Sequence, residues 1–483
     1  MKSKYLNELL DPDLLVKQQT IEKLAINKVV YDSRKVEDRS LFVAIHGYSN
    51  DGHSYLKDVP NHGAIAAIVE KDNFEVKIPQ YIVKDSRIAL ASIASKFYRP
   101  ELDKMRVVGI TGTNGKTTTS FLIRSILNEA RIYSGLIGTI HYDIGGELIQ
   151  AWNTTPESVD LFQMMYNMYQ HDQQGCVLEA SSHGLALHRL DGINFEIAVF
   201  TNLSQDHLDF HASFEDYYQA KKSLFLQLKP EGTAIINSDD AYGQRLIAEL
   251  QSNILDFNTT GNATVSATHW DSSLNGVTLL AQTPLGNINI ISPLIGKFNI
   301  ENILAAIVAG IALDIDLVTI KRGIESVSRV PGRLEPVPVN LDKTVIVDYC
   351  HTPDALEKAL HVLADITEKK LWVVFGCGGD RDKKKRPLMG KIAVENADHV
   401  IITSDNPRSE APNSIIEEIL SGIKEPHKVE VEENRRRAIE NALNKASAGD
   451  TILVAGKGHE TYQEIDGIKY TFDDRLVIKE SVT

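Results

Sequence analysis

Short apolar runs alternate along the chain with stretches in which apolar residues recur every three or four positions. "MRVVGIT" from Met105 predicts a strand, and "TTTSFLIRSILNEA" behind it predicts a helix. The runs "GCVLEAS", "IAVFTNLS" and "GTAIINSDD", which begin at Gly175, Ile197 and Gly232, predict further buried strands. Strands that alternate with helices in this way indicate a parallel sheet covered by helices on both faces.

The pattern changes twice, and the changes suggest three domains. Between residues 260 and 295, short alternating runs such as "GNINIIS" predict an antiparallel edge or a small extra sheet. "VSRVPGRLEPV" near Pro331 predicts a hinge, after which strand-like runs resume. We therefore expect an α/β protein in three parts. These are a small mixed α/β domain at 1–103, a central phosphate-loop domain with a parallel and a small antiparallel sheet at 104–332, and a Rossmann-like domain at 333–483.

The composition of the chain excludes several classes of protein. The chain has 483 residues, of which 43% are hydrophobic and 24% charged, as in globular proteins with several cores. Its net charge of −14 argues against a nucleic-acid-binding protein with a broad basic face. Cys176, Cys350 and Cys377 are too scattered for a disulfide framework or a zinc site, and we expect buried free thiols. No run of about 18 apolar residues occurs, so we expect a cytoplasmic protein outside the membrane.

A glycine-rich loop, "GITGTNGKTTT", separates the first central strand from its helix. Three glycines between Gly109 and Gly115 let the backbone approach an anion, and Lys116 adds a positive charge. The threonines behind Lys116 add hydroxyls at the helix N-terminus. Ile110 stands where the usual phosphate loop has its first glycine, which leaves a shorter G-x-x-G-K-T pattern. A turn that only caps the helix is the alternative; we expect a nucleoside triphosphate site.

Polar side chains follow the next two central strands. Glu179 closes one strand, and Asp206, His207, Asp209 and His211 follow the other. Because parallel strands present their carboxyl ends at one edge, these groups suit a Mg²⁺ ion beside a triphosphate. Each histidine taken alone is equally well explained by a surface or core role.

Three further motifs allow two interpretations each. "NTTPES" from Asn153 offers hydroxyls to a ligand or an N-cap to a helix that begins near Thr155. "AKKSLF" from Ala220 puts two lysines on a helix, and the pattern alone favours a solvated face. Asn299 and Asn302 share one helix face, where asparagine either caps the helix or contacts a ligand.

Polar residues also follow the strands of the last domain. Four polar stretches follow apolar runs here, and together with Arg381, Arg408, Lys457, His459 and Glu460 they predict a second site. The lysine run 383–385 is compatible with a solvated loop.

Several of these motifs, taken in order, resemble one family. "GTNGKTTT", "NTTPES", "EASSHGL", "DHLDFH", "YCHTPDAL", "GCGGDRDKKKRPLMG" and "SDNPRSE" are similar to motifs of the Mur ligases, the ATP-dependent amide-bond synthetases of peptidoglycan assembly. The resemblance extends from near Asp32 to near Gly456, and it is strongest to the members that add the third residue of the peptide. It implies ATP and a UDP-N-acetylmuramoyl dipeptide as substrates and Mg²⁺ as the cofactor.

The resemblance also implies roles for the residues at matching positions. The nucleotide-sugar peptide is expected to contact Tyr31, Ser33, Tyr48, Ser49, Asn50, Asn153, Thr154, Thr155, Ser181, Leu187 and Arg189. ATP is expected to contact Gly112, Thr113, Asn114, Gly115, Lys116, Thr117, Thr118, Asn302, Arg333 and His351. The metal is expected on Thr117, Glu179, His207 and Lys221, the last as a carbamate. The catalytic set is expected to be Lys116, Glu179, His207 and Lys221. The incoming amino acid is expected to contact Arg381, Asp405, Asn406, Pro407, Arg408, Gly456 and Glu460.

The implied reaction is ligation through an acyl phosphate, which the amine of the incoming amino acid attacks. "SDNPRSE" is typical of members that add meso-diaminopimelate, and a guanidinium on Arg408 can pair with the distal carboxylate of that substrate. L-lysine is the alternative substrate, and Arg408 is then expected only to brace its loop against Asp405 or Glu410. The rivals are a folylpolyglutamate synthetase-like ligase and a nucleotide-dependent switch without ligation. We expect a monomer.

Overall fold

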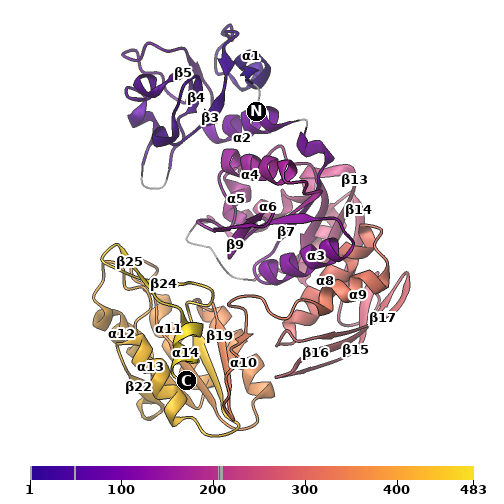
Figure 1. The fold of residues 1–483 in the computed structure, drawn as a ribbon, viewed down its shortest axis with the longest axis vertical. Coiled ribbons are helices and arrows are strands. Elements are labelled where there is room, and N and C mark those ends of the chain that lie inside the picture. Colours follow the sequence, from indigo (N-terminus) through magenta and orange to yellow (C-terminus); the bar gives the residue numbers. More distant parts are fainter. Residues whose placement is uncertain (1–2, 48–49, 100, 205, 207–209, 483) are drawn as a thin grey trace. The chain divides into compact units, whose positions relative to one another are not determined.

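A computed structural model describes residues 3–47, 50–99, 101–204, 206 and 210–482 (Figure 1). The chain forms two compact units. The first comprises Met1–Ser266, Thr283–Leu285 and Asn302–Gly323, and the second comprises Ala267–Gln282, Gly286–Glu301 and Ile324–Thr483.

The N-terminal part of the first unit is built on a four-stranded parallel sheet. Its strands follow the order β3 (Lys28–Val30), β4 (Ser40–Val43), β5 (Ala64–Val69) and β6 (Gln80–Ile82). Alternate strand residues point to opposite faces. Leu41 and Ile68 share a core with helix α2 (Ser86–Tyr98), whereas Phe42 and Ala67 belong to a separate core on the other face. The short strands β1 (Lys4–Tyr5) and β2 (Ala25–Ile26), which pair antiparallel, and the helix α1 (Leu6–Leu9) between them in sequence complete this part.

The central sheet follows in the order β10-β9-β8-β11-β7-β12-β13-β14-β15-β16-β17. Its parallel strands are β8 (Ser134–Ile137), β11 (Gly175–Glu179), β7 (Arg106–Thr111), β12 (Phe195–Phe200), β13 (Leu228–Asn237) and β14 (Asn253–Asn258). The buried strands expected from the apolar runs are thus confirmed. β9 (His141–Ile144) and β10 (Glu147–Gln150) form an antiparallel hairpin at one end. β15 (Val265–Ser273) pairs in parallel with β14 through Val265 and Ser266, and β16 (Gly276–Thr283) and β17 (Gly286–Ser292) follow it in the strand order. The alternating runs thus form strands, and most of β15–β17 belongs to the second unit.

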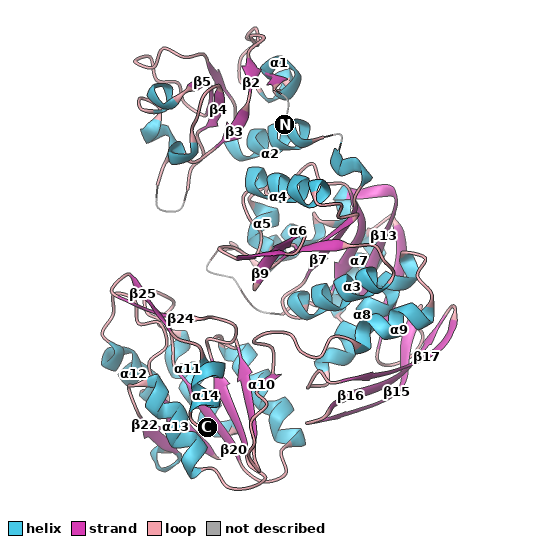
Figure 2. Cartoon of the chain, viewed as in Figure 1, coloured by secondary structure: helices cyan, strands magenta, loops and turns pink. Residues whose placement is uncertain are grey.

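Helices connect these strands (Figure 2). They are α3 (Lys116–Glu129), α4 (Ser158–Gln170), α5 (Ser182–Ala186), α6 (Phe214–Lys222), α7 (Ala241–Glu249), α8 (Phe298–Ala312) and α9 (Leu317–Glu325). Gly310 of α8 and Gly323 of α9 are closely packed: a Cβ on Gly310 would lie 2.6 Å from the side chain of Ile320 on α9, and one on Gly323 would lie 2.6 Å from the Cα of Ile126 on α3. These contacts fix α3, and therefore the glycine loop that precedes it.

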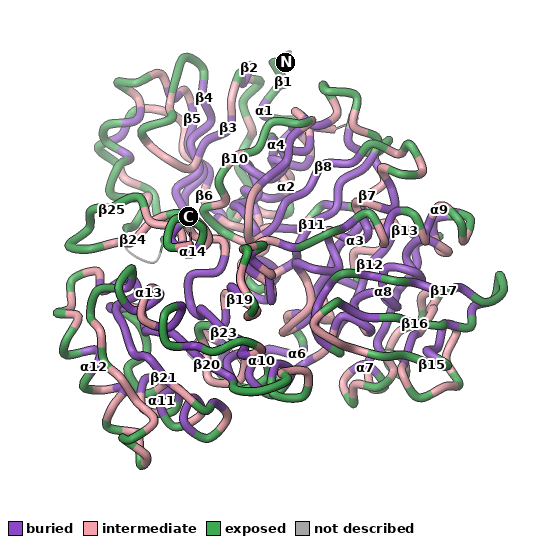
Figure 3. Tube along the Cα trace, turned by 60° about the horizontal axis from the view of Figure 1, so that its bottom comes forward, coloured by how far each residue is buried: buried purple, intermediate pink, exposed green. Residues whose placement is uncertain are grey.

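The second unit contains the Rossmann-like sheet. Its order is β18 (Glu335–Pro336), β19 (Thr344–Asp348), β23 (Thr451–Ala455), β20 (Leu371–Phe375), β21 (His399–Ile402) and β22 (Val429–Val431), and only β18 is antiparallel. The inner strands are buried along their length (Figure 3). One face packs against α10 (Pro353–Ile366), α11 (Lys385–Asn396) and α12 (Pro412–Leu420), and the other against α13 (Arg435–Lys445) and α14 (Asp474–Glu480). A hairpin of β24 (Tyr462–Ile465) and β25 (Ile468–Thr471) follows β23.

Cys176, Cys350 and Cys377 are buried free thiols, as expected. Within the described part of the chain, no helix is long and apolar enough to cross a bilayer.

Candidate active site

The glycine loop between β7 and α3 has a shape that only glycine allows at two positions. Gly112 has φ 149° and Gly115 has φ 89°. A Cβ atom on Gly112 would lie 1.8 Å from Thr201 Oγ1, and one on Gly115 would lie 2.4 Å from Asn302 Oδ1. The loop is therefore held against the residue that follows β12 and against α8, in contacts too close for a side chain at either glycine.

The first turn of α3 carries the groups that suit a phosphate. Because α3 begins at Lys116, its first backbone N–H groups have no carbonyl partner within the helix, and the helix dipole favours an anion there. Lys116 Nζ donates hydrogen bonds of 2.9 Å to the carbonyls of Gly112 and Thr113. Thr118 is buried in the same turn. Asn202 anchors the loop through Thr113 and Asn114, whose N–H groups donate to its carbonyl and side-chain oxygens at 2.9 and 3.0 Å.

Glu179 is a buried carboxylate surrounded by hydroxyl and amide donors. It is 1% exposed. Thr117 Oγ1 donates to Glu179 Oε2 at 3.0 Å, and Thr139 donates through its hydroxyl at 2.9 Å and its backbone N–H at 3.0 Å. A carboxylate next to a threonine hydroxyl supplies the hard oxygen ligands that Mg²⁺ prefers, so the donor set fits that ion. His207, expected as a further ligand, lies outside the described residues.

Lys221 on α6 is buried beside the loop. It is 1% exposed, and its Nζ donates to the Gly112 carbonyl at 2.7 Å and lies 4.4 Å from the centre of the Tyr217 ring. Burial, and next the charge of Lys116, hold the pKa of Lys221 well below its usual value. A solvated face is therefore wrong for Lys221. The solvated-face interpretation fits the adjacent Lys222 better, because Lys222 forms an ion pair with Glu249 at 2.8 Å.

Thr155 connects several residues expected at the peptide end of the substrate. Its hydroxyl donates to the Glu179 carbonyl at 2.8 Å and accepts from the Ser181 N–H at 3.0 Å. Arg189 Nη1 donates to the Thr155 carbonyl at 2.9 Å. Thr155 does not cap a helix, because α4 begins at Ser158 with Glu157 at the N-cap position. The N-cap interpretation of Thr155 is therefore wrong.

Two acidic residues near the start of α4 were missed by the sequence analysis. Glu157 accepts from Arg87 Nη1 at 2.7 Å and from Arg189 Nε at 3.1 Å. Asp160 accepts from the Tyr31 hydroxyl, and burial together with Asp160 raises the pKa of Tyr31. The available signal was an aspartate on the apolar side of an amphipathic helix, where charges are rarely left unpaired.

The other expected substrate residues are less closely connected. Ser33 begins a short turn after Asp32, Leu187 is half-buried at the end of α5, and the Thr154 hydroxyl lies 3.1 Å from that of Thr139. Asn50 and Asn153 are exposed. Tyr48 and Ser49 lie outside the described residues.

In the second unit, the loop after β21 meets the segment after β23. Lys457 Nζ donates to Asn406 Oδ1 at 2.8 Å, and Asn406 Nδ2 donates to Glu460 Oε2 at 2.8 Å. Asp405 is buried, and a Cβ on Gly456, which has φ 112°, would lie 2.6 Å from its Oδ2. Pro407 is buried in the same loop. Asp405, Asn406, Gly456 and Glu460 are thus brought together.

Arg408 continues this loop in a left-handed conformation, with φ 51°. Its Nη1 donates to the Gly379 carbonyl at 2.6 Å, and its Nε lies 3.4 Å from Glu464 Oε2. The side chain therefore does not brace the loop against Asp405 or Glu410. No pattern in the sequence pointed to Glu464, which lies in the β24–β25 hairpin.

Three other expected residues of this unit, Arg381, Arg333 and His351, contact other groups. Arg381 is exposed and donates to the Asp380 carbonyl at 3.3 Å. The Arg333 guanidinium lies 5.3 Å from the centre of the Tyr349 ring, and His351 is exposed. Both belong to the second unit, whereas Asn302 belongs to the first.

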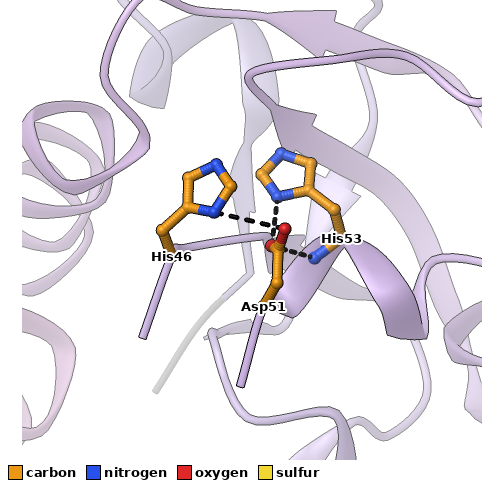
Figure 4. Close-up of side chains that lie close together, drawn as sticks. All are labelled: His46, Asp51 and His53. Carbon is orange, nitrogen blue, oxygen red and sulfur yellow. Dashed lines mark hydrogen bonds and ion pairs between the residues drawn. The ribbon is translucent and has the colours of Figure 1, made fainter. Parts of the chain in front are cut away.

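A cluster of His46, Asp51 and His53 has ligand atoms within 4.8 Å of one another (Figure 4). His53 Nε2 accepts the N–H of Glu70 at 2.9 Å, so in the neutral ring Nδ1 carries the proton and donates to Asp51 at 2.7 Å. A metal ion on that Nδ1 would displace the proton to Nε2 and break the bond from Glu70. The cluster is therefore better explained as a hydrogen-bond network at the base of the loop that carries Asn50.

Three protein-family models match the chain, each over a different stretch. "Mur ligase family, catalytic domain" matches residues 25–113, "Mur ligase middle domain" matches 110–310, and "Mur ligase, glutamate ligase domain" matches 332–458.

Curated proteins match over nearly the whole length. A UDP-N-acetylmuramoyl-L-alanyl-D-glutamate–2,6-diaminopimelate ligase from Geobacter metallireducens is 42% identical over 94% of this chain and 93% of its own. A protein of the same name from Listeria monocytogenes is 42% identical over 98% of this chain and 97% of its own.

Solved structures match as well. A structure of a ligase with that name is 34% identical, covers 99% of both chains and has a TM-score of 0.71. Folylpolyglutamate synthase from Mycobacterium tuberculosis is 19% identical over 77% of this chain and 92% of its own, with a TM-score of 0.63, and shares the fold.

Proposed function

This chain belongs to the Mur ligase family, and from that premise we propose that it joins meso-2,6-diaminopimelate to UDP-N-acetylmuramoyl-L-alanyl-D-glutamate, at the expense of ATP, in peptidoglycan precursor synthesis. The observation that carries the proposal is nearly full-length identity of 42% to ligases of that name. Residues 1–103 are assigned to the uridine diphosphate end of the substrate, 104–332 to ATP and 333–483 to the amino acid. The use of ATP and a nucleotide sugar places the reaction in the cytoplasm.

The first chemical step is transfer of the γ-phosphoryl group of ATP to the peptide carboxylate, which gives an acyl phosphate and ADP. Two anions must approach each other, so positive charge is needed where negative charge develops. Lys116 supplies it at the start of α3, where the helix dipole adds to its effect. In this scheme Lys116 exchanges its bonds to the loop carbonyls for bonds to phosphate.

Thr117 and Glu179 would hold Mg²⁺, with His207 and a carbamate on Lys221. When bound, the ion neutralises phosphate charge. A lysine reacts with CO₂ only as the neutral amine: Nζ bonds to carbon and releases a proton, and a carbamate anion remains. Burial beside Lys116 favours that neutral amine. The carbamate in turn places a negative charge where an ammonium would repel the metal.

The second step is attack of the amino group of the incoming residue on the acyl phosphate carbon. Phosphate leaves, and the amine proton is lost. Asp405, Asn406 and Glu460 carry acceptor oxygens for that ammonium before it reacts, and Arg408 carries donors for a carboxylate.

The function is tested by ADP release from the purified protein with the UDP-muramoyl dipeptide and a panel of amino acids. Release is expected only when the dipeptide substrate and meso-diaminopimelate are both present, and L-lysine is expected to be turned over at least 100-fold less efficiently. Equal use of L-lysine would overturn the choice of amino acid. ADP release without either co-substrate would favour a nucleotide-dependent switch.

A further inference from the structure

Arg408 and Glu464 form a partly exposed ion pair, and each of the two side chains has an atom that can form a further hydrogen bond. Their side chains are 20% and 24% exposed, and Nε of the arginine lies 3.4 Å from Oε2 of the glutamate. Arg408 Nη1 donates a hydrogen bond to the Gly379 carbonyl. Within the described part of the chain, Arg408 Nη2 has no hydrogen-bond partner, and neither has Glu464 Oε1.

The backbone holds the two residues together independently of their side chains. The Arg408 N–H donates to the Glu464 carbonyl at 3.0 Å, and the Asp466 N–H donates to the Arg408 carbonyl at 2.8 Å. The Glu464 N–H donates to Asn406 Oδ1 at 3.0 Å. The β24–β25 hairpin is thus attached to the loop that carries Arg408, and this attachment keeps Arg408 in its left-handed conformation.

The distal end of diaminopimelate carries a carboxylate and an ammonium on one carbon. A guanidinium next to a carboxylate is the complementary pair: Arg408 matches the substrate carboxylate, and Glu464 matches the substrate ammonium. Without substrate, the two side chains partly satisfy each other. We propose that Glu464 is a specificity-determining residue that binds the distal ammonium of the incoming amino acid beside Arg408. This inference rests on the proposed function and extends it to a residue outside the recognised motifs.

Two substrates distinguish the role of Glu464 from that of Arg408. meso-Diaminopimelate has both distal groups, whereas 2-aminopimelate has the distal carboxylate and lacks the distal amine. In the wild type we expect a lower KM for meso-diaminopimelate. Glu464→Gln should raise that KM about tenfold, the lower range for a charge-assisted hydrogen bond at a partly exposed site, and should change the KM for 2-aminopimelate less than twofold. The kcat values should stay within about threefold.

Two further variants serve as references. Arg408→Lys should raise the KM for both amino acids, because both carry the distal carboxylate. Asp466→Asn removes a charge of the same sign from the same hairpin, tolerates the left-handed φ of 50° at that position, and should alter neither KM. Thermal unfolding of each variant checks that the hairpin still folds.

The outcomes separate this inference from the function on which it rests. An equal rise of both KM values in Glu464→Gln would mean that Glu464 only supports the loop, and no rise in either would mean that it takes no part; each result overturns the inference. A wild type that ignores meso-diaminopimelate and uses another amino acid would overturn the proposed function itself.

Discussion

At the scale of single residues, Lys221 shows how burial changes chemistry. Burial and the nearby charge of Lys116 destabilise the charged ammonium form of Lys221. The neutral amine is therefore favoured, and only the neutral amine can be carboxylated. The sign of this effect also sets a pH dependence. Because the pKa of Lys221 is lowered, the neutral amine persists to lower pH than in an ordinary lysine, and acid conditions should remove the carbamate.

Lys221→Ala is expected to lose at least 100-fold in kcat, since the metal loses a ligand. Acetate or formate at high concentration should restore part of the activity by occupying the vacated space. Lys222→Ala is the matched control and should keep near-normal turnover, because Lys222 pairs with Glu249 on the surface. An active Lys221→Ala, or an inactive Lys222→Ala, would count against the assigned role.

Gly115→Ala is a second test at this scale. The added Cβ would collide with Asn302 Oδ1, and alanine tolerates φ 89° poorly. We expect a loss of about 1–3 kcal/mol in stability and a large rise in the KM for ATP. Combining it with Asn302→Gly removes the collision but not the backbone strain, so stability should return only in part. Full stability of the single variant would refute the loop geometry.

At the scale of elements, a buried arginine on α11 supports the loop that carries Arg408. Arg386 is fully buried, and its guanidinium donates to Glu410 at 2.8 and 2.9 Å, to Glu418 at 2.7 Å and to the Gly378 carbonyl at 3.1 Å. It thereby joins α11, α12 and two loops. Removing one partner from such a buried arrangement leaves the others desolvated and unpaired.

Arg386→Met should therefore lower stability by about 3 kcal/mol and raise the KM for the amino acid, while the KM for ATP stays unchanged. Thermal unfolding and steady-state kinetics measure the two effects. Arg436→Met is the control: it breaks an exposed pair with Glu480 and should cost less than about 1 kcal/mol. Similar losses in both variants would show that burial is not the cause.

The elements were largely predictable, and the contacts between them were not. Buried parallel strands appear as continuous apolar runs, so β7, β11 and β12 were recognisable from the sequence. The role of Glu157 depends on Arg87, about 70 residues earlier in the chain, and that of Glu464 depends on Arg408; no local pattern reports such pairs. Lys221 and Lys222 look alike in sequence, and only packing separates them.

At the scale of the whole molecule, Arg87 connects the N-terminal part of the first unit to its central part. Its Nη1 donates to Glu157 at 2.7 Å, and its Nη2 donates to the carbonyl of His46 at 2.9 Å, at the base of the loop that carries Asn50. Glu157 in turn holds Arg189. One side chain thus couples residues assigned to opposite ends of the nucleotide-sugar peptide.

Arg87→Ala should raise the KM for the UDP-muramoyl dipeptide about tenfold and leave the KM for the amino acid unchanged, since the second unit is untouched. Lys96→Ala on the same helix is the control, because the ion pair that Lys96 forms with Asp11 spans 3.8 Å at the surface. A parallel rise in both KM values would indicate general unfolding instead.

The strand order of the second unit also has a consequence for synthesis on the ribosome. β23, at Thr451–Ala455, lies between β19 and β20, which precede it by about 80 to 100 residues. Until β23 emerges from the ribosome, β19 and β20 each present an unpaired apolar edge, which is a template for association with other chains. A nascent chain stalled before residue 451 should therefore depend on chaperones, whereas the first unit is complete by residue 323.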